Sequence, residues 1–264
     1  MRERQAGDPV TRTVYGATGL LVLFLLLEAA PRLGLVPERY LPPASRILRA
    51  LWTEASGAGF WRAVADTVRT GATGLAIAFC AAVALGMIIG SVPLLRAMTN
   101  STVEVLRPIP SVALIPLVVL QFGTDIRSTV VLVVYACFWQ VLIQVLYGAV
   151  DVDPVAHDTA RSYGLGTWAR LRHVTWPTAL PYVITGLRLA ATVALIVSIT
   201  GELLIGSPGL GREIAVAQSS GAVPAMYGLV VATGMIGVLV NVGVRGLERR
   251  VLAWHPAVRA EIPA

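Results

Sequence analysis

The sequence contains no lysine: all 21 of its basic residues are arginines, against 15 acidic residues, so arginine alone gives the net charge of +6. This absence excludes two kinds of chemistry. A phosphate-binding P-loop needs a lysine that reaches the nucleotide phosphates, and a Schiff-base enzyme needs a lysine amine. If ATP drives the activity of this protein, another polypeptide must hydrolyse it.

Charged residues and cysteines are also scarce. Only 14% of the residues are charged, whereas soluble domains carry about a quarter. The two cysteines, Cys80 and Cys137, lie in apolar segments without disulfide or metal-ligand spacing, and no histidine has companions that would complete a metal site. No paired carboxylates or nucleophile motif stands out. We therefore expect no cofactor, no metal and no enzymatic activity of the chain itself.

Long apolar runs dominate the sequence instead. Thr70–Val92 and Ser128–Val150 each extend for 23 residues without a charged side chain, and a helix of about 20 such residues crosses the hydrocarbon layer of a membrane. We expect an all-α, polytopic membrane protein with about six transmembrane helices. The expected spans are Val14–Ala30, Thr67–Val92, Val103–Phe122, Ser128–Val150, Leu180–Ile205 and Met226–Val244.

The third expected span is unusual, because it contains Glu104, Arg107 and three prolines. Irregular backbone persists at membrane depth only where protein or water satisfies it, so we expect this segment to be kinked and buried in the bundle. Glu104 and Arg107 are expected to form a structural ion pair, with a role in solute binding as the alternative. Upstream, residues 45–52 form an amphipathic pattern with Ser45 as N-cap, which suits a helix along the membrane surface or one packed on the bundle.

Small residues recur at intervals of four in two expected spans, which predicts close helix packing. The two series are Ala82, Gly86 and Gly90, and Gly186, Ala190, Ala194 and Ser198. Glu202 continues the second series, and an acidic residue near the end of a membrane helix usually faces protein or water. The candidates for lining a solute path are Gln140, Gln144, Arg188, Ser198 and Glu202. Arg188 can alternatively reach the membrane surface or pair with an acidic group.

Residues 151–180 form the longest polar stretch inside the hydrophobic region. Asp153 is expected to cap a helix that Gly164 ends in a left-handed conformation. Thr167 is expected to cap a second short helix, which ends at Pro177. Two short helices joined by a glycine form a compact projection, called the knob below (residues 153–177), that can dock into a partner protein.

The motif in the knob reads Asp158-Thr159-Ala160, three residues, Gly164, nine residues, then Val174-Thr175-Trp176-Pro177. It resembles the EAA loop of bacterial importer permeases, which reads Glu-Ala-Ala, three residues, Gly, nine residues, Ile-x-Leu-Pro. The departures at Asp158, Thr159 and Trp176 preserve acidic, small and apolar character. The resemblance implies a loop that couples the permease to a separate ATPase. Its residues are Asp158, Thr159, Ala160, Gly164, Val174, Trp176 and Pro177.

Further segments resemble, in the same order, the permeases of nitrate, sulfonate and taurine ABC importers; these are residues 41–44, 108–117, 122–123, 185–188, 201–204 and 209–211. The resemblance implies the type I importer (MetI-like) permease fold in the bacterial cytoplasmic (inner) membrane. It also implies a homodimer that works with ATPase subunits and an extracytoplasmic solute-binding protein. The implied solute is a small anion such as nitrate, a sulfonate or taurine. The alternatives are an importer of a vitamin-like or thiamine-precursor-like solute and an ion-gradient-driven secondary transporter.

The expected organisation has three parts: residues 1–59 with the first span and the amphipathic helix, a permease domain at 60–248, and a cytoplasmic tail at 249–264. The distribution of arginines between loops predicts that both termini are cytoplasmic. Residues 206–211 are expected to form an outer loop that contacts the binding protein, or a plain turn. The pI is about 9.9, but the arginines are scattered between apolar spans, so lipid rather than nucleic acid is the expected partner.

Overall fold

The computed structural model describes residues 9–254, and every regular element within this range is helical. Five helices are long and apolar enough to cross a membrane, and a bent pair of helices supplies a sixth span if it is counted as one. This agrees with the six expected spans. The described residues form two compact units, of which the first comprises residues up to Phe60 and 214–232, and the second residues 61–213 and those after 232. Most of the expected cytoplasmic tail, residues 255–264, lies outside the described residues.

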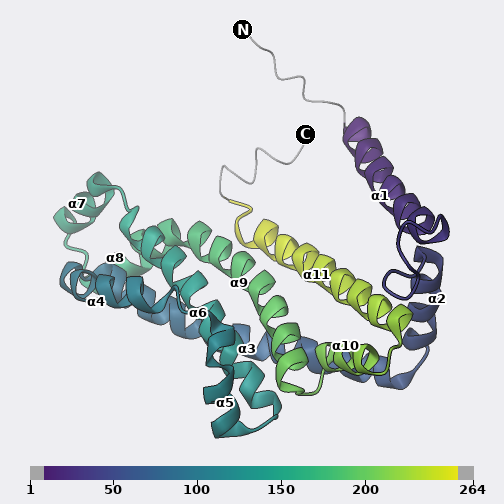
Figure 1. Ribbon diagram of the computed structural model, residues 1–264. Coiled ribbons are helices and arrows are strands. Elements are labelled where there is room, and N and C mark those ends of the chain that lie inside the picture. Colours follow the sequence, from purple (N-terminus) through teal and green to yellow (C-terminus); the bar gives the residue numbers. More distant parts are fainter. Residues whose placement is uncertain (1–8, 255–264) are drawn as a thin grey trace. The chain divides into compact units, whose positions relative to one another are not determined.

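The second unit is organised around three long helices, α3 (Ala58–Ser91), α6 (Ile126–Val150) and α9 (Trp176–Ile205). Glycines bring them together. Gly86 of α3 lies so close to α6 that a Cβ atom there would be 2.7 Å from Val145 Cγ1. One turn further along α6, a Cβ atom added to Gly148 would be 2.8 Å from the Ala179 Cα of α9. The helix backbones therefore approach each other closely at glycines, as small residues permit in membrane helices. Figure 1 shows α6 and α9 side by side.

Both predicted series of small residues lie at these helix interfaces. Ala82, Ala190 and Ser198 are fully buried, and Gly86, Gly90 and Gly186 are buried as well. Opposite them, α6 presents Val133, Cys137, Val141 and Val145, four residues apart and all fully buried. The prediction of close packing along the two series is confirmed.

The third expected span is broken. It consists of α4 (Pro93–Leu106), a 3₁₀ turn η1 (Ser111–Leu114) and α5 (Ile115–Phe122), and its two halves meet at an angle of 81°. The expected kink is therefore confirmed. The expected burial is wrong for α4, which contains no buried residue, although Val103 packs in part against the core. The expected ion pair is also wrong: Glu104 accepts a hydrogen bond from Asn100 Nδ2 at 3.1 Å, and Arg107 lies at the end of α4, where the chain turns.

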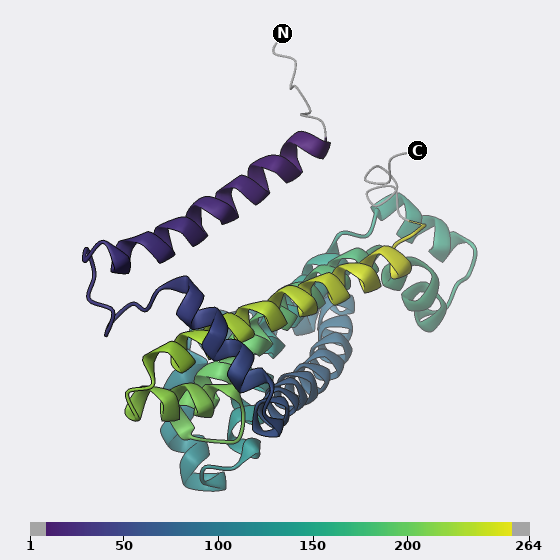
Figure 2. The ribbon, with the colours of Figure 1, turned by 90° about the vertical axis from the view of Figure 1, so that its right-hand side faces the viewer.

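The first unit contains α1 (Pro9–Arg32), α2 (Ala44–Ala55) and the adjoining part of α11 (Val223–Val251); Figure 2 shows the loop that joins α1 to α2. Ser45 is not the N-cap of α2, because the helix already begins at Ala44. The Glu28 carboxylate of α1 instead accepts from the Ser45 backbone N–H and hydroxyl at 2.8 and 2.9 Å. Ile47 of α2 is buried, whereas Trp52 is 78% exposed. The amphipathic helix thus packs on protein along one side only.

Candidate functional site

The knob begins with the predicted caps. Asp153 accepts a hydrogen bond from the Val155 N–H at 2.8 Å, and α7 (Pro154–Ser162) follows. Gly164 ends the helix in the left-handed conformation, with φ +73°. The Leu165 N–H donates back to the Ala160 carbonyl at 3.0 Å, which completes a Schellman motif. The first half of the knob is therefore built as the sequence predicted.

The second half of the knob differs from the prediction. α8 (Thr167–Arg170) begins at Thr167 and has no side-chain cap, because Gly166 occupies the N-cap position. The helix does not end at Pro177 either. A π-helical turn, η2 (Leu171–Thr175), joins α8 directly to α9, with the Trp176 N–H donating to the Leu171 carbonyl five residues back. Proline lacks an N–H and crowds the carbonyl four residues before it, and the wider turn accommodates both effects.

Large apolar side chains are exposed on the knob. Val155, Tyr163 and Trp168 are 71%, 81% and 73% exposed, and the Asp158 side chain also points to solvent. Ala160 is buried and holds α7 in place. Such an exposed apolar group on a polar projection is typical of a protein-interaction site. The motif did not reveal Val155, Tyr163 and Trp168, because their exposure depends on how the two helices are turned.

A second cluster, called the loop anchor below, lies at the opposite end of α9 around Glu202, whose side chain is fully buried. Its Oε2 accepts hydrogen bonds from Thr67 Oγ1 of α3 at 2.8 Å and from the Gly211 N–H at 3.0 Å. Thr67 Oγ1 in turn accepts from the Leu210 N–H at 2.9 Å. Glu202 and Thr67 thereby cap α10 (Leu210–Ser219), whose first N–H groups have no partner within the helix.

The chain between α9 and α10 is held tightly against this cluster. Ser207 is fully buried, and its hydroxyl lies 2.7 Å from that of Thr129 on α6. A methyl group at Gly209 would overlap the Glu202 carboxyl, and one at Gly211 would overlap the Ile199 carbonyl oxygen. Residues 206–211 therefore form a packed connection that fixes the start of α10 to α3 and α6, and not a free surface turn.

Replacing Glu202 with alanine is expected to lower the apparent melting temperature of the detergent-solubilised protein by about 10 °C. The change leaves the buried Gly211 N–H and Thr67 hydroxyl without acceptors, at about 1–3 kcal/mol each, and about 1 kcal/mol corresponds to 2–4 °C in a chain of this size. Glu202→Gln keeps an acceptor oxygen and should lose less than half as much. Equal losses in the two variants would contradict the assignment of these hydrogen bonds.

A recess of about 200 Å³ lies at the break between α4 and η1. Arg107, Ser111, Trp139 and Gln140 line it with hydrogen-bond donors, and apolar residues of α9 complete the wall. The Trp139 ring is held edge-on between Phe138 and Tyr135, with centroid distances of 5.1 and 6.0 Å. Its buried Nε1–H has no hydrogen-bond partner among the described residues.

The five candidates for the solute path lie in different environments. Gln140 lines the recess, whereas Gln144 packs against Gly186 between α6 and α9. Arg188 lies 3.6 Å from Glu248 of α11, as the alternative of an acidic partner anticipated. Ser198 is buried beside Gly71, and Glu202 belongs to the loop anchor. Arg107, for which a role in solute binding was the alternative to an ion pair, lines the recess next to Gln140, and sequence reasoning missed only Trp139 beside them.

Comparison with known proteins agrees with this architecture. Residues 82–253 match the family model of the binding-protein-dependent transport system inner membrane component. The taurine transport system permease protein TauC of Escherichia coli is 30% identical over 95% of this chain and 94% of its own length. A putative aliphatic sulfonates transport permease protein, SsuC of Escherichia coli, is 28% identical (87% and 88% covered). The nitrate import permease protein NrtB of Leptolyngbya laminosa is 26% identical (73% and 69% covered).

Solved structures show the same fold. A chain of the MetNI methionine ABC transporter in an inward-facing conformation is 19% identical, with a TM-score of 0.59, and 76% of this chain and 96% of that chain are covered. A chain of an amino acid ABC transporter gives 20% identity and a TM-score of 0.60, with 73% and 94% covered. The type I importer fold, the knob and the family match lead to one conclusion: the chain belongs to the binding-protein-dependent transport system inner membrane component family, the membrane-spanning permeases of ABC transporters.

Proposed function

We propose that this permease forms the path by which an ABC importer carries a small oxoanion across a bacterial cytoplasmic membrane. Three relatives are named as taurine, aliphatic sulfonate and nitrate permeases. Sulfonate and nitrate groups share one feature, a negative charge spread over three oxygen atoms. The recess carries the proposal, because its donors match such a group.

The recess offers positive charge and directed donors to an anion. The guanidinium of Arg107 has no carboxylate within 4.0 Å among the described residues. Beside it, Trp139 supplies an unpaired N–H, and Gln140 and Ser111 supply an amide and a hydroxyl. Arginine recognises planar and tetrahedral oxoanions through its fork of N–H groups. A break in a membrane helix is also where transporters place solute sites, because backbone groups are free there.

The knob is the proposed docking site for the ATPase. ATP hydrolysis belongs to a separate chain, because this sequence has no lysine for a P-loop. The coupling residues predicted from the motif lie in the knob beside the exposed Tyr163 and Trp168. With the knob in the cytoplasm and each of six spans crossing once, both termini also lie in the cytoplasm.

A second copy of the chain is the proposed partner along α4. That helix has no buried residue, and it exposes Asn100 and Glu104 together with the apolar Met98 and Val105. Polar and charged side chains of membrane spans usually face protein or water rather than lipid. Two copies facing each other through α4 would also place the two recesses along a shared path.

Uptake by the reconstituted transporter tests the proposed function. The permease, reconstituted with its cognate ATPase and binding protein, is expected to accumulate radiolabelled taurine, an alkanesulfonate or nitrate in proteoliposomes only when ATP is supplied to the ATPase. The permease without the ATPase, under a proton or sodium gradient, serves as the control. Gradient-driven uptake would establish a secondary transporter instead, and ATP-driven uptake of a thiamine-like cation alone would contradict the oxoanion.

A further inference from the structure

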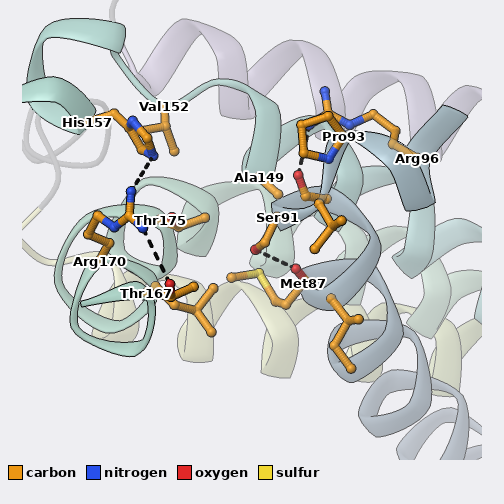
Figure 3. A pocket seen from close by; sticks show the side chains of 14 residues that line it. Met87, Ser91, Pro93, Arg96, Ala149, Val152, His157, Thr167, Arg170 and Thr175 are labelled. Atoms are coloured by element: carbon orange, nitrogen blue, oxygen red, sulfur yellow. Dashed lines mark hydrogen bonds between the residues drawn. The ribbon is translucent and has the colours of Figure 1, made fainter. Parts of the chain in front are cut away.

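A separate cleft of about 600 Å³ lies where α3 and α6 end and the knob begins. We call it the arginine cleft, after Arg96 at the start of α4 and Arg170 at the end of α8, which line it together with His157 of α7. In Figure 3, Arg170 and His157 lie on one side of the cleft and Arg96 on the other. All of these residues belong to the second unit.

The arginine cleft carries positive charge without a compensating carboxylate. No Asp or Glu is among the residues that line it. Within residues 9–254, moreover, neither Arg96 nor Arg170 has a carboxylate oxygen within 4.0 Å. Asp158 is 3.9 Å from His157, but its side chain is 77% exposed and does not line the cleft. The two guanidinium groups therefore lack the partner that half-buried arginines normally have.

Most of the donors of these arginines are unused or poorly satisfied. Arg96 donates through Nη2 to the Gly90 carbonyl at 2.9 Å, near the end of α3, but its Nε is buried without a partner. Arg170 makes two long contacts of 3.4 Å, to His157 Nε2 and Thr167 Oγ1 (Figure 3), and its Nε is likewise buried without a partner. A buried donor left without an acceptor costs about 1–3 kcal/mol. Both sides of the cleft therefore have hydrogen-bond donors that an acceptor of a ligand could satisfy.

We propose that the arginine cleft binds a phosphate group, either as orthophosphate or as the headgroup of an anionic phospholipid. Arginine pairs with phosphate through two parallel N–H···O bonds, and a tetrahedral phosphate has enough oxygens to meet two guanidinium groups from opposite sides. A cleft of this volume also admits a glycerophosphate headgroup. Anionic lipids and basic pockets between membrane helices are known to associate by this chemistry.

A phosphate in this position links two parts of the second unit that are far apart in the sequence. Arg96 belongs to the junction of α3 and α4, whereas Arg170 and His157 belong to the knob. The bound group thus ties the knob to the end of the bundle. It makes the position of the knob depend on phosphate or on the lipid composition, and this dependence is separate from the transported solute and its recess.

Thermal melting of the full-length permease in detergent tests the proposal. One arm compares sodium phosphate with sodium chloride at equal ionic strength, and the other compares dioctanoyl phosphatidylglycerol with dioctanoyl phosphatidylcholine. Phosphate or phosphatidylglycerol is expected to raise the melting temperature by at least 3 °C. The shift should disappear in Arg96→Gln and Arg170→Gln. It should persist in the matched control Arg172→Gln, because Arg172 is exposed and does not line the cleft.

The two arms separate the sources. A shift with phosphatidylglycerol alone identifies a lipid headgroup, and a shift with orthophosphate alone identifies the free ion. Arg96→Lys should retain part of either shift, because the positive charge remains. The proposal is overturned if wild-type protein responds to neither probe, if Arg96→Gln or Arg170→Gln responds as the wild type does, or if phosphatidylcholine acts as strongly as phosphatidylglycerol. No arm depends on solute uptake, so failure here leaves the proposed function untouched.

Discussion

Gly164→Val is expected to reduce ATP-driven solute uptake at least tenfold while the membrane bundle stays folded. Gly164 has φ +73°, and a left-handed residue with a side chain costs about 1–2 kcal/mol, more for a β-branched one. The helix it terminates, α7, has only nine residues, and helices shorter than about 12–15 residues are marginal without caps. The strain therefore changes the local shape of the knob and not the distant helix packing.

Gly166→Val is the matched control for this prediction. Gly166 lies two residues away in the same loop, and a Cβ atom at either glycine would have no neighbouring atom within 4 Å. The φ of −62° and ψ of 165° at Gly166, however, suit any residue. Uptake and co-purification of the ATPase with the permease are measured for both variants. Equal effects, or normal ATPase binding and uptake by Gly164→Val, would show that the shape of the knob does not matter for coupling.

Arg107→Gln is expected to weaken uptake of an oxoanion by about 10- to 100-fold. A hydrogen bond to a charged group contributes about 1.5–3 kcal/mol, and each 1.4 kcal/mol is a factor of ten. Arg107→Lys keeps the charge but loses the planar fork, so it should transport at an intermediate rate. Initial uptake rates over a range of solute concentrations, with the binding protein saturated, measure the effect.

Arg127→Gln serves as the control for Arg107, since its side chain is 79% exposed and it lies at the start of α6, away from the recess. It should transport as the wild type does. If Arg107→Gln and Arg127→Gln lose uptake equally, the effect arises from the loss of a positive charge in general and the recess is not the anion site. A variant with Trp139→Phe, which removes the indole N–H and part of the ring but no charge, should show a smaller loss than Arg107→Gln.

The sequence predicted most of the bundle, because the signals involved are local and strong. Apolar runs located the spans within a few residues for α6 and α9, and the small residues around Gly86 and Ala190 identified the packed faces. The caps at Asp153 and Gly164 were predictable for the same reason, since a cap depends only on neighbouring residues. The start of α3 at Ala58, nine residues before the expected span, was missed because the charged residues Arg62 and Asp66 interrupt the apolar run while the helix continues through them.

Features that depend on contacts between distant segments were not predictable. Pro177 is a strong signal for a helix end, but the π-helical turn η2 lets the helix continue through the proline. Only the combined geometry of α8 and α9 reveals this turn. Arg107 and Glu104 have the spacing of an ion pair, yet Glu104 accepts from Asn100 on the preceding turn and Arg107 lines the recess. Arg107 and Trp139 are far apart in the sequence, so only the folded chain places them in one recess.

The π-helical turn has a mechanical consequence. Because it keeps the chain helical through Pro177, residues Thr167–Ile205 form one helix of 39 residues, about 58 Å long at 1.5 Å per residue. The knob lies at one end of this rod and the loop anchor at the other. A rigid rod works as a lever: a tilt of about 10° around its midpoint moves each end by roughly 5 Å in opposite directions. A displacement of the knob would thus be transmitted along the helix to the start of α10, without any refolding of the chain between them.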